Sequence, residues 1–364
     1  MKELTYEQDR RRAQSALLGT ETASKVSGHV MRSASPQLAS HTAHVDSPSR
    51  GAFHSGYGET WAKTILIGEH SAVYGYPAVA FPLHSMKMKA WATPNLNGRH
   101  ELRALGFSGP LEESGQRFAG IRRAVTVAEE FVSPRRWSAF TFVTEADFPA
   151  ERGLGSSAAA AGAVIRAVLD AYGMSATSQE LFELTNRAEM VTHGHPSGLD
   201  SATTCSRNAV MLSAGRISQL SIQSSGVLII ADSGICGSTR EAVDSVRSQY
   251  EQDKPRVGAI LAELGTLGSQ SVNDLQRGAI GDLGVHMNAA HILLAQLKVS
   301  DPTLNRLVSA ARESGALGAK MTGGGLGGCI VALAADQRQA DTVMRKLKQT
   351  GARGVWSHRL GAVA

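Results

Sequence analysis

Short apolar runs alternate with helical patterns along most of the chain. Brief runs of apolar residues bounded by glycine or polar residues predict buried strands, and these occupy 64–67, 79–83, 86–92, 140–143, 227–231, 317–321, 329–333 and 354–358. Apolar residues spaced three and four apart predict helices, and these occupy 119–131, 158–172, 178–193, 239–252, 285–297, 301–314 and 339–349. The mixture indicates an α+β fold of two halves that divide near 213–226.

Two of the predicted helices carry further information. The helix over 158–172 is apolar on nearly every face, so we expect it to be buried. The helix over 178–193 begins at Ser178, which we expect to cap it, with Glu180 and Glu183 in or near its first turn.

Residues 1–58 do not follow this pattern. They contain Arg10-Arg-Arg12, many serines and few apolar residues. A segment of this composition cannot bury enough apolar surface to offset the entropy that is lost on ordering. We therefore expect a disordered N-terminal extension, followed by two domains over 59–220 and 221–364.

Composition narrows the class of protein. The chain has 364 residues, enough for one large or two medium domains. It has no uncharged apolar stretch of about 18 residues, so we expect no membrane span. The net charge of +5 suits anionic small molecules, and the dense basic stripe with interleaved aromatic residues that is typical of nucleic-acid binding is missing from the sequence. Cys205, Cys236 and Cys329 form no zinc or disulfide pattern and fit a cytoplasmic protein.

The clearest functional motif is Gly153-Leu-Gly-Ser-Ser-Ala-Ala159, which leads directly into a predicted helix. At a helix N-terminus four backbone N–H groups lack intrahelical partners and the dipole is positive, so an anion binds there readily. Glycines let the backbone close around that anion. The motif is neither a Walker A loop nor a Rossmann fingerprint. It predicts a phosphate site, with a tight turn capped by serine as the alternative.

Charged residues at strand ends are the next candidates. Lys63 opens an apolar strand, where it is either a surface residue or a buried charge with a partner. Glu69 and His70 follow the same strand after a glycine, where their side chains can point into a cleft. The glycine-rich loop 323–328 lies between two predicted strands and is longer than a hairpin turn needs. We expect its backbone to approach a ligand closely.

Two carboxylates complete the set. Asp200 follows a turn that contains Pro196 and Gly198, and it is either a helix cap or a functional carboxylate. Glu189 lies near the C-terminus of its helix, where a negative charge is disfavoured unless a cation compensates it. A metal ion or a basic side chain would compensate the charge of Glu189, as would His193, which lies at position i+4 from it. The residues alone leave these alternatives open.

Two glycine-rich loops, a lysine, a glutamate and an aspartate are together the groups that Mg-nucleotide phosphoryl transfer requires. One loop holds the phosphates, a serine and the glutamate hold the metal ion, and the lysine and aspartate attend the attacking hydroxyl. The expected cofactor is therefore Mg²⁺, with a nucleotide as the co-substrate.

Three motifs resemble those of the GHMP kinase superfamily, in the same order and with similar spacing. They are Lys63-Thr-Ile-Leu-Ile-Gly-Glu-His-Ser-Ala-Val-Tyr-Gly-Tyr-Pro-Ala78, Gly153-Leu-Gly-Ser-Ser-Ala-Ala159 and Lys320-Met-Thr-Gly-Gly-Gly-Leu-Gly-Gly-Cys329. The segment His193-Gly-His-Pro-Ser-Gly-Leu-Asp200 is similar to the catalytic-aspartate region of one family within it, the mevalonate kinases. The resemblance covers about residues 59–364.

This resemblance implies a fold and an activity. The N-terminal, ATP-binding domain over 59–220 would resemble domain 2 of ribosomal protein S5, and the C-terminal domain over 221–364 would be ferredoxin-like. ATP and substrate would lie in the cleft between them. The γ-phosphate of ATP would pass to the primary hydroxyl of (R)-mevalonate, giving 5-phosphomevalonate in the mevalonate pathway of isoprenoid biosynthesis. The resemblance also implies a homodimer.

The resemblance further implies a role for each motif residue. Asp200 would be the catalytic carboxylate and Lys63 its cationic partner. Ser157 and Glu189 would ligate Mg²⁺. The ATP phosphates would be bound by Gly153, Leu154, Gly155, Ser156, Ser157 and Ala158. The substrate would be contacted by Glu69, His70 and Gly324.

Other functions match less well. Phosphomevalonate kinase usually has tyrosine where His70 stands, and galactokinase continues the Gly-Glu-His segment with Asp-Tyr. Homoserine kinase lacks the pair formed by Lys63 and Asp200, and diphosphomevalonate decarboxylase fits the glycine-loop pattern less closely. A nucleotide sensor on the same fold would not need these charged groups or Glu189. A nucleic-acid-binding role rests only on Arg10–Arg12 and the basic net charge.

Overall fold

The computed structural model describes residues 54–133, 138–193 and 197–361. Most of the predicted N-terminal extension therefore lies outside the described residues. Strand β1 (Gly56–Ile67) begins inside the last part of that extension and pairs with β2 (Ala78–Asn95). The outer part of β1 alternates between buried and more exposed positions, so it is longer than the apolar run at 64–67 predicted.

The first half of the chain forms a seven-stranded sheet. Six of its strands follow the order β4-β3-β5-β2-β6-β7, and the seventh strand, β1, also pairs with β2. The further strands are β3 (Glu101–Ala104), β4 (Phe107–Pro110), β5 (Ala139–Ala146), β6 (Val210–Ser213) and β7 (Arg216–Gln219). Neighbouring strands are antiparallel except β3 and β5, which run parallel.

The two strands predicted over 79–83 and 86–92 are in fact one strand. β2 is continuous, and its pairing with β1 shifts register between Trp61 and Ala62 of β1. The segment 84–86 of β2 bulges at this shift. Its polar residues are typical of a turn, so the hydrophobic pattern predicts two strands where the structure has one.

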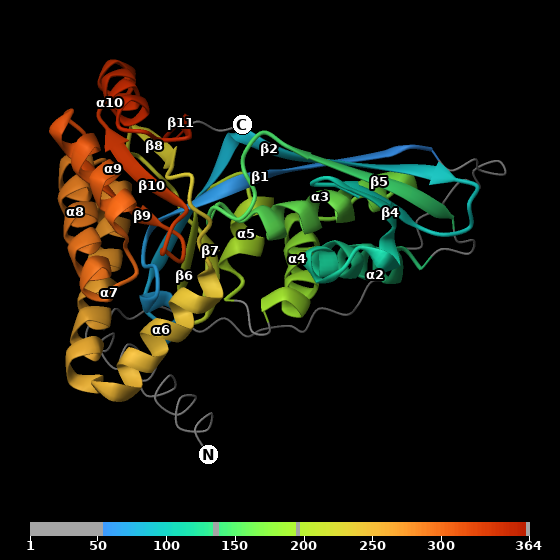
Figure 1. The fold of residues 1–364 in the computed structure, drawn as a ribbon, viewed down its shortest axis with the longest axis horizontal. Helices are drawn as coiled ribbons and strands as arrows, with labels where there is room; N and C mark the ends of the chain where they lie inside the picture. The colour runs from blue at the N-terminus through green and yellow to red at the C-terminus, as the bar shows by residue number, and fades with distance from the viewer. Residues whose placement is uncertain (1–53, 134–137, 194–196, 362–364) are drawn as a thin grey trace, which may run out of the picture. The chain divides into compact units, whose positions relative to one another are not determined.

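Four helices accompany this sheet: α2 (Ala119–Val132), α3 (Ser156–Ala171), α4 (Ser178–His193) and α5 (Leu199–Cys205). Helix α3 packs on β1 and β2, while α2 and α4 pack on α3 (Figure 1). This middle position confirms the prediction that the helix over 158–172 is buried. The short 3-10 helices are η1 (Ser71–Tyr74), η2 (Leu111–Glu113) and η3 (Gln116–Phe118).

Ser178 does not cap α4, contrary to the prediction. It is the first helical residue, and the capping hydroxyl belongs to Thr177, whose Oγ1 accepts the Glu180 N–H at 3.2 Å. The Glu180 Oε2 in turn accepts the Thr177 N–H at 2.8 Å. This reciprocal pair is a capping box, and it starts the helix one residue earlier than a cap at Ser178 would.

The second half forms a four-stranded antiparallel sheet in the order β11-β8-β10-β9. Its strands are β8 (Val227–Asp232), β9 (Gly318–Thr322), β10 (Cys329–Ala334) and β11 (Gly354–Arg359). Its helices are α6 (Thr239–Gln252), α7 (Lys254–Arg277), α8 (Ile280–Gln296), α9 (Pro302–Glu313) and α10 (Gln337–Gln349). The strand order and the β-α-β-β-α-β succession are ferredoxin-like, so the predicted α+β fold is confirmed. The domain boundary after residue 220 stays a prediction.

Helix α7 is an element that the sequence pattern misses. It has 24 residues, and Asp253 caps it by accepting the Arg256 N–H at 3.1 Å. Gly265 lies so close to Tyr76 that a Cβ would come within 2.3 Å of the ring. Packing thus requires a residue that helix propensity disfavours. No described helix, α7 included, is long and apolar enough to cross a membrane.

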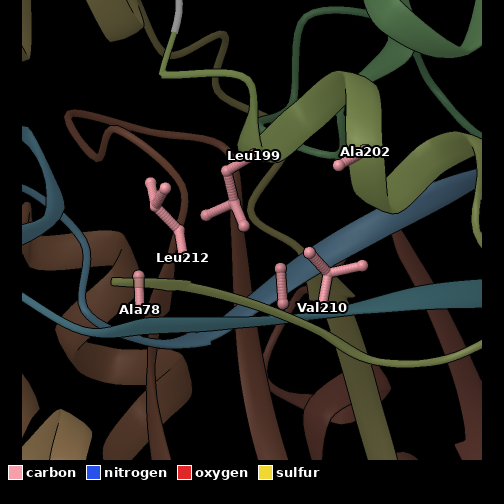
Figure 2. Packing of buried hydrophobic residues seen from close by; sticks show 6 residues of the cluster. Ala78, Leu199, Ala202, Val210 and Leu212 are labelled. Carbon is pink, nitrogen blue, oxygen red and sulfur yellow. The ribbon is translucent and has the colours of Figure 1, made fainter. Parts of the chain in front are cut away.

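A small apolar cluster fixes α5 on the first sheet. Leu199 and Ala202 of α5 pack against Ala78 of β2 and Val210 of β6 (Figure 2). The two helical residues are three positions apart and therefore share one face of α5. This packing sets the orientation of Asp200, which follows Leu199 in the chain.

Truncating Leu199 should loosen this helix. Its side chain is 3% exposed, so we expect Leu199→Ala to lower the free energy of unfolding by about 2–5 kcal/mol through lost burial and a residual cavity. Urea denaturation measures this change. Leu96→Ala is the control, because Leu96 is 103% exposed and a surface truncation should stay within about 0.5 kcal/mol. Equal effects of the two substitutions would contradict a supporting role for Leu199.

Candidate active site

Lys63 and Asp200 form the central contact of the site. The Lys63 Nζ lies 2.9 Å from Asp200 Oδ1, with the lysine side chain 3% exposed and the aspartate side chain 45% exposed. Lys63 is therefore a buried charge with a partner, not a surface residue. Gly198 is the N-cap of α5, and Asp200 lies in the first turn, where the helix dipole stabilises its negative charge. The Asp200 carboxylate is thus accessible to a ligand, while the Lys63 ammonium is buried.

The glycine loop 153–155 lies directly against Lys63. The Lys63 N–H donates to the Leu154 carbonyl at 2.9 Å, which ties β1 to the loop. Gly155 has φ +71, and a Cβ there would lie 2.8 Å from Lys63 Cγ. Glycine is therefore required at this position both by backbone conformation and by the lysine stem.

The N-terminus of α3 has the properties of an anion site. Gly155 is its N-cap, and no described side chain caps the helix, so the alternative of a serine-capped turn is wrong. The N–H groups of Ser156, Ser157 and Ala158 belong to the first turn, which lacks intrahelical acceptors and carries positive dipole charge. The geometry fits the predicted phosphate site, which stays a prediction.

Ser157 and Glu189 face one another beside this helix end. The Ser157 hydroxyl donates to Glu189 Oε1 at 2.6 Å, and Glu189 is 2% exposed. Burial, opposed by the hydrogen bond from Ser157 and aided by the Asp200 charge, raises the pKa of Glu189 to about 7. The structure brings the two predicted metal ligands into contact. Side-chain contacts of His193, the other partner considered for Glu189, lie outside the described residues.

This donor set fits Mg²⁺. A hydroxyl and a carboxylate supply the hard oxygen ligands that Mg²⁺ prefers, and Mg²⁺ is commonly held by one or two carboxylates together with substrate phosphates. Among the residues that the structure describes, no group of three or more His, Cys, Asp and Glu side chains is placed to hold a metal ion.

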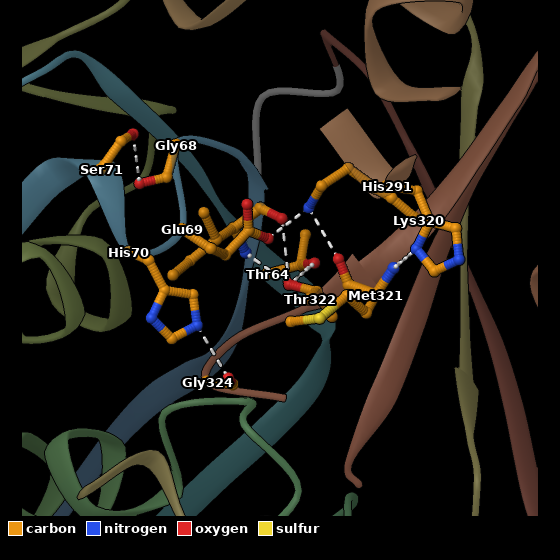
Figure 3. A network of polar contacts seen from close by, with 11 residues as sticks. Thr64, Gly68, Glu69, His70, Ser71, His291, Lys320, Met321, Thr322 and Gly324 are labelled. Carbon is orange, nitrogen blue, oxygen red and sulfur yellow. Dashed lines mark hydrogen bonds and ion pairs between the residues drawn. The ribbon is translucent and has the colours of Figure 1, made fainter. Parts of the chain in front are cut away.

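Glu69 and His70 lie together in a second, buried group. Glu69 Oε1 forms an ion pair with Lys320 Nζ, and His70 Nε2 lies 2.9 Å from the Gly324 carbonyl oxygen (Figure 3). Burial lowers the pKa of His70 to about 4, so its ring is neutral at physiological pH and Nε2–H donates to that carbonyl. The structure thus brings together the three residues predicted to contact substrate.

The glycine-rich loop 323–328 packs against other backbone of the protein. A Cβ at Gly323 would lie 3.1 Å from the Cα of Gly153, and one at Gly324 would lie 2.7 Å from the Cα of Thr239. The two glycine loops therefore touch, and α6 begins beside them. Glycine is therefore needed at these positions because the loop packs closely against other backbone of the protein, and not only because a ligand would approach it.

Three polar residues of the site have no assigned role in the sequence prediction. Lys320 and Thr322 lie on β9, and Arg152 precedes the first glycine loop. The Arg152 Nε lies 3.0 Å from Asp232 Oδ1 on β8. The signal for Lys320 is a charge inside the apolar run 317–321, the same signal that singled out Lys63. Its partner lies 251 residues away, so no local pattern reveals it.

Comparisons with known proteins agree with this geometry. The family model described as GHMP kinases N terminal domain matches residues 121–208, and the model described as GHMP kinases C terminal matches residues 271–353. A mevalonate kinase of Thermococcus sibiricus is 32% identical over 298 residues, which cover 76% of this chain and 88% of that protein. A mevalonate kinase of Pyrococcus furiosus is 30% identical over 305 residues, which cover 78% of this chain and 91% of that protein.

A solved structure extends the comparison to the whole fold. The crystal structure of L. major mevalonate kinase in complex with R-mevalonate is similar with a TM-score of 0.73 at 26% identity. The match covers 84% of this chain and 95% of that chain. The similarity therefore extends over most of the chain.

Proposed function

Because this chain belongs to the GHMP kinase superfamily and, within it, to the mevalonate kinase family, we propose that Lys63 and Asp200 activate the hydroxyl that is phosphorylated. The enzyme catalyses ATP-dependent phosphorylation of the primary hydroxyl of (R)-mevalonate, giving 5-phosphomevalonate. The two-domain GHMP kinase fold is confirmed by both family models and by the similar structure. The observation that carries the residue roles is the 2.9 Å contact of Lys63 with Asp200, beside a glycine loop at a helix N-terminus.

Asp200 acts on the attacking hydroxyl. The alcohol oxygen bonds to the γ-phosphorus while the bond from that phosphorus to the bridging oxygen of ADP breaks. A carboxylate is far too weak a base to ionise an alkanol before attack. In a loose transition state the alcohol carries little negative charge until late. Asp200 therefore orients the hydroxyl first and accepts its proton late in the transfer.

Lys63 supports both functions of Asp200. Its buried ammonium contacts Asp200 Oδ1 at 2.9 Å, so it fixes the carboxylate in one position. The same positive charge stabilises the negative charge that develops on the attacking oxygen. The Leu154 carbonyl binds the backbone N–H of Lys63, and Gly155 packs against the aliphatic part of its side chain. These contacts limit the freedom of Lys63 to turn away from Asp200.

The α3 N-terminus binds the ATP phosphates in this proposal. The residues that do so are Gly153, Leu154, Gly155, Ser156, Ser157 and Ala158. Ser157 and Glu189 hold Mg²⁺, in keeping with their 2.6 Å contact and their oxygen donors. Bound there, Mg²⁺ would neutralise part of the negative charge of the phosphates. Glu69, His70 and Gly324 contact mevalonate in this proposal.

Neutralising Glu189 tests the metal assignment. We expect Glu189→Gln to raise the Mg²⁺ concentration needed for half-maximal activity by about tenfold or more, because an amide is a weaker ligand than a carboxylate. A Mg²⁺ titration at saturating ATP measures this shift. Glu183→Gln is the matched control on the exposed face of α4. An unchanged Mg²⁺ requirement in folded Glu189→Gln would contradict the assignment.

The activity itself is tested by offering two acceptors to one preparation. ADP release with Mg-ATP is expected with mevalonate and not with 5-phosphomevalonate. Turnover on 5-phosphomevalonate alone would favour a phosphomevalonate kinase and would overturn the role of His70. Tight nucleotide binding without turnover on either acceptor would favour the sensor.

Two further properties complete the proposal. We place the enzyme in the cytoplasm, where ATP is available and thiols such as the buried Cys205 and Cys329 stay reduced. We also propose a homodimer, as the family resemblance implies. Light scattering of the purified chain measures its mass in solution, and a monomer at working concentration would overturn this part.

A further inference from the structure

Lys320 is a buried charge that the proposed chemistry does not use. It lies on β9 in the second half of the chain and is 0% exposed. Its ammonium donates to Glu69 Oε1 and, at 2.7 Å, to the Met321 carbonyl. Glu69 belongs to the first half, directly after β1. The ion pair therefore joins the two halves beside the residues that contact substrate (Figure 3).

The second oxygen of Glu69 is left without a donor. Oε2 is buried and has no hydrogen-bond partner among the described residues. An unsatisfied buried acceptor costs free energy, and the cost is larger for a charged group. A ligand hydroxyl can remove that cost by donating to Oε2. Glu69 thus has one oxygen held by the protein and one oxygen whose capacity to accept a hydrogen bond is unused.

The position of Lys320 is fixed by the next residues of its strand. The Ile65 N–H donates to Thr322 Oγ1 at 3.0 Å, and that hydroxyl donates to the Ile65 carbonyl at 3.0 Å. The Thr64 hydroxyl also donates to Thr322 Oγ1 at 3.0 Å. These bonds set the alignment of β9 against β1, so Lys320 meets Glu69 in one register only.

We propose that Lys320 is a positioning residue for substrate binding, which holds Glu69 ionised and oriented so that its free oxygen accepts a hydrogen bond from a mevalonate hydroxyl. This proposal rests on the proposed function of the site. Stability alone does not explain the pair, because a buried ion pair is often no more stabilising than apolar residues of similar volume. A role in holding a ligand-binding carboxylate does explain it.

Four basic groups face this carboxylate or its partner. They are Lys320 from β9, Lys63 from β1, His70 after β1 and, next to Lys320, His291 from α8. Burial raises the pKa of Glu69, and the Lys320 charge opposes that rise. Both histidines have a pKa lowered to about 4. Removing Lys320 therefore leaves the Glu69 pKa higher, and Glu69 protonates at a higher pH.

The test compares Lys320→Met with Lys320→Arg. In Lys320→Met we expect the KM for mevalonate to rise by about tenfold or more, the equivalent of a hydrogen bond to a charged group, while the KM for ATP changes by less than about twofold. The acidic limb of kcat/KM for mevalonate should move to higher pH. Lys320→Arg keeps the charge and should restore most of the wild-type acidic limb.

Two more variants keep the test decisive. If Lys320→Met unfolds, the double variant Glu69→Gln/Lys320→Met removes both charges and is expected to fold, yet to retain the raised mevalonate KM. Asp232→Asn is the matched control, because it breaks another ion pair between the halves, that of Asp232 with Arg152. Its KM for mevalonate should stay within about twofold of the wild type.

Several results would overturn the proposal. One is a folded Lys320→Met, or a folded double variant, with an unchanged mevalonate KM. Another is an acidic limb that does not move in Lys320→Met, or an equal rise in KM on Asp232→Asn, since that would mean that any contact between the halves suffices. Failure of the proposed function is separate, because wild-type protein would then release no ADP with mevalonate.

Discussion

Asp200→Asn is expected to lower kcat for mevalonate by about 10²–10⁴-fold. The amide keeps the size and the place of the carboxylate in the first turn of α5 but cannot accept the proton of the attacking hydroxyl, and positioned proton transfer contributes about this factor. Because the substitution leaves Lys63, which is 3% exposed, without its counter-charge, it should also lower the free energy of unfolding. Steady-state ADP release measures kcat, and urea denaturation checks the fold.

An Asp200→Asn enzyme that keeps more than about a third of its kcat would remove Asp200 from the mechanism. The matched control is Asp147→Asn, since Asp147 also pairs with a lysine, Lys89, at 3.7 Å and is 48% exposed. Exposed ion pairs contribute little, so this control should retain the wild-type kcat within about twofold.

Lys63→Met is expected to lower kcat by about 10²–10³-fold. The substitution keeps the buried stem that packs against Gly155 and removes the positive charge beside the developing alkoxide, a loss of the size found for one electrostatic stabiliser. Single-turnover transfer from ATP measures the chemical step. Lys89→Met is the control on the surface pair.

The double variant separates a shared function from two independent ones. If Lys63 and Asp200 act as one unit, Lys63→Met/Asp200→Asn should cost about as much as the more damaging single substitution. If the kcat losses of the two single variants multiply instead, the 2.9 Å contact between Lys63 and Asp200 has no catalytic significance.

The sequence predicts the local structure around the proposed catalytic groups well, because each group lies in a short local pattern. The glycines before Ser156 predict a helix N-terminus, and the structure has α3 beginning there. Lys63 stands out as a charge in an apolar strand and proves to be buried. Asp200 follows a glycine turn and lies in the helical turn after it. In all three cases the neighbours in sequence are also the neighbours that decide the local structure.

Features that depend on distant contacts are the ones that the sequence does not reveal. Helix α7 is concealed by Gly265 and Gly268, which helix propensity disfavours but which the close approach of Tyr76 and Pro77 requires. β2 is divided in the pattern because a bulge cannot be told from a turn without its partner strand. Thr177 replaces Ser178 as the cap because adjacent hydroxyls are equivalent until the backbone is known.

The ion pair between Lys320 and Glu69 also constrains the order in which the site is completed during synthesis. Chains emerge from the N-terminus, and Glu69 is made 251 residues before its counter-charge. If the nascent chain buried the segment after β1 early, the Glu69 carboxylate would be buried without a counter-charge. We therefore expect this segment to stay hydrated until β9 docks. Lys63 and Asp200 belong to the part that is made first. The proposed phosphate-transfer groups can therefore assemble before the proposed substrate-binding group around Glu69, which is complete only when Thr322 reaches Ile65.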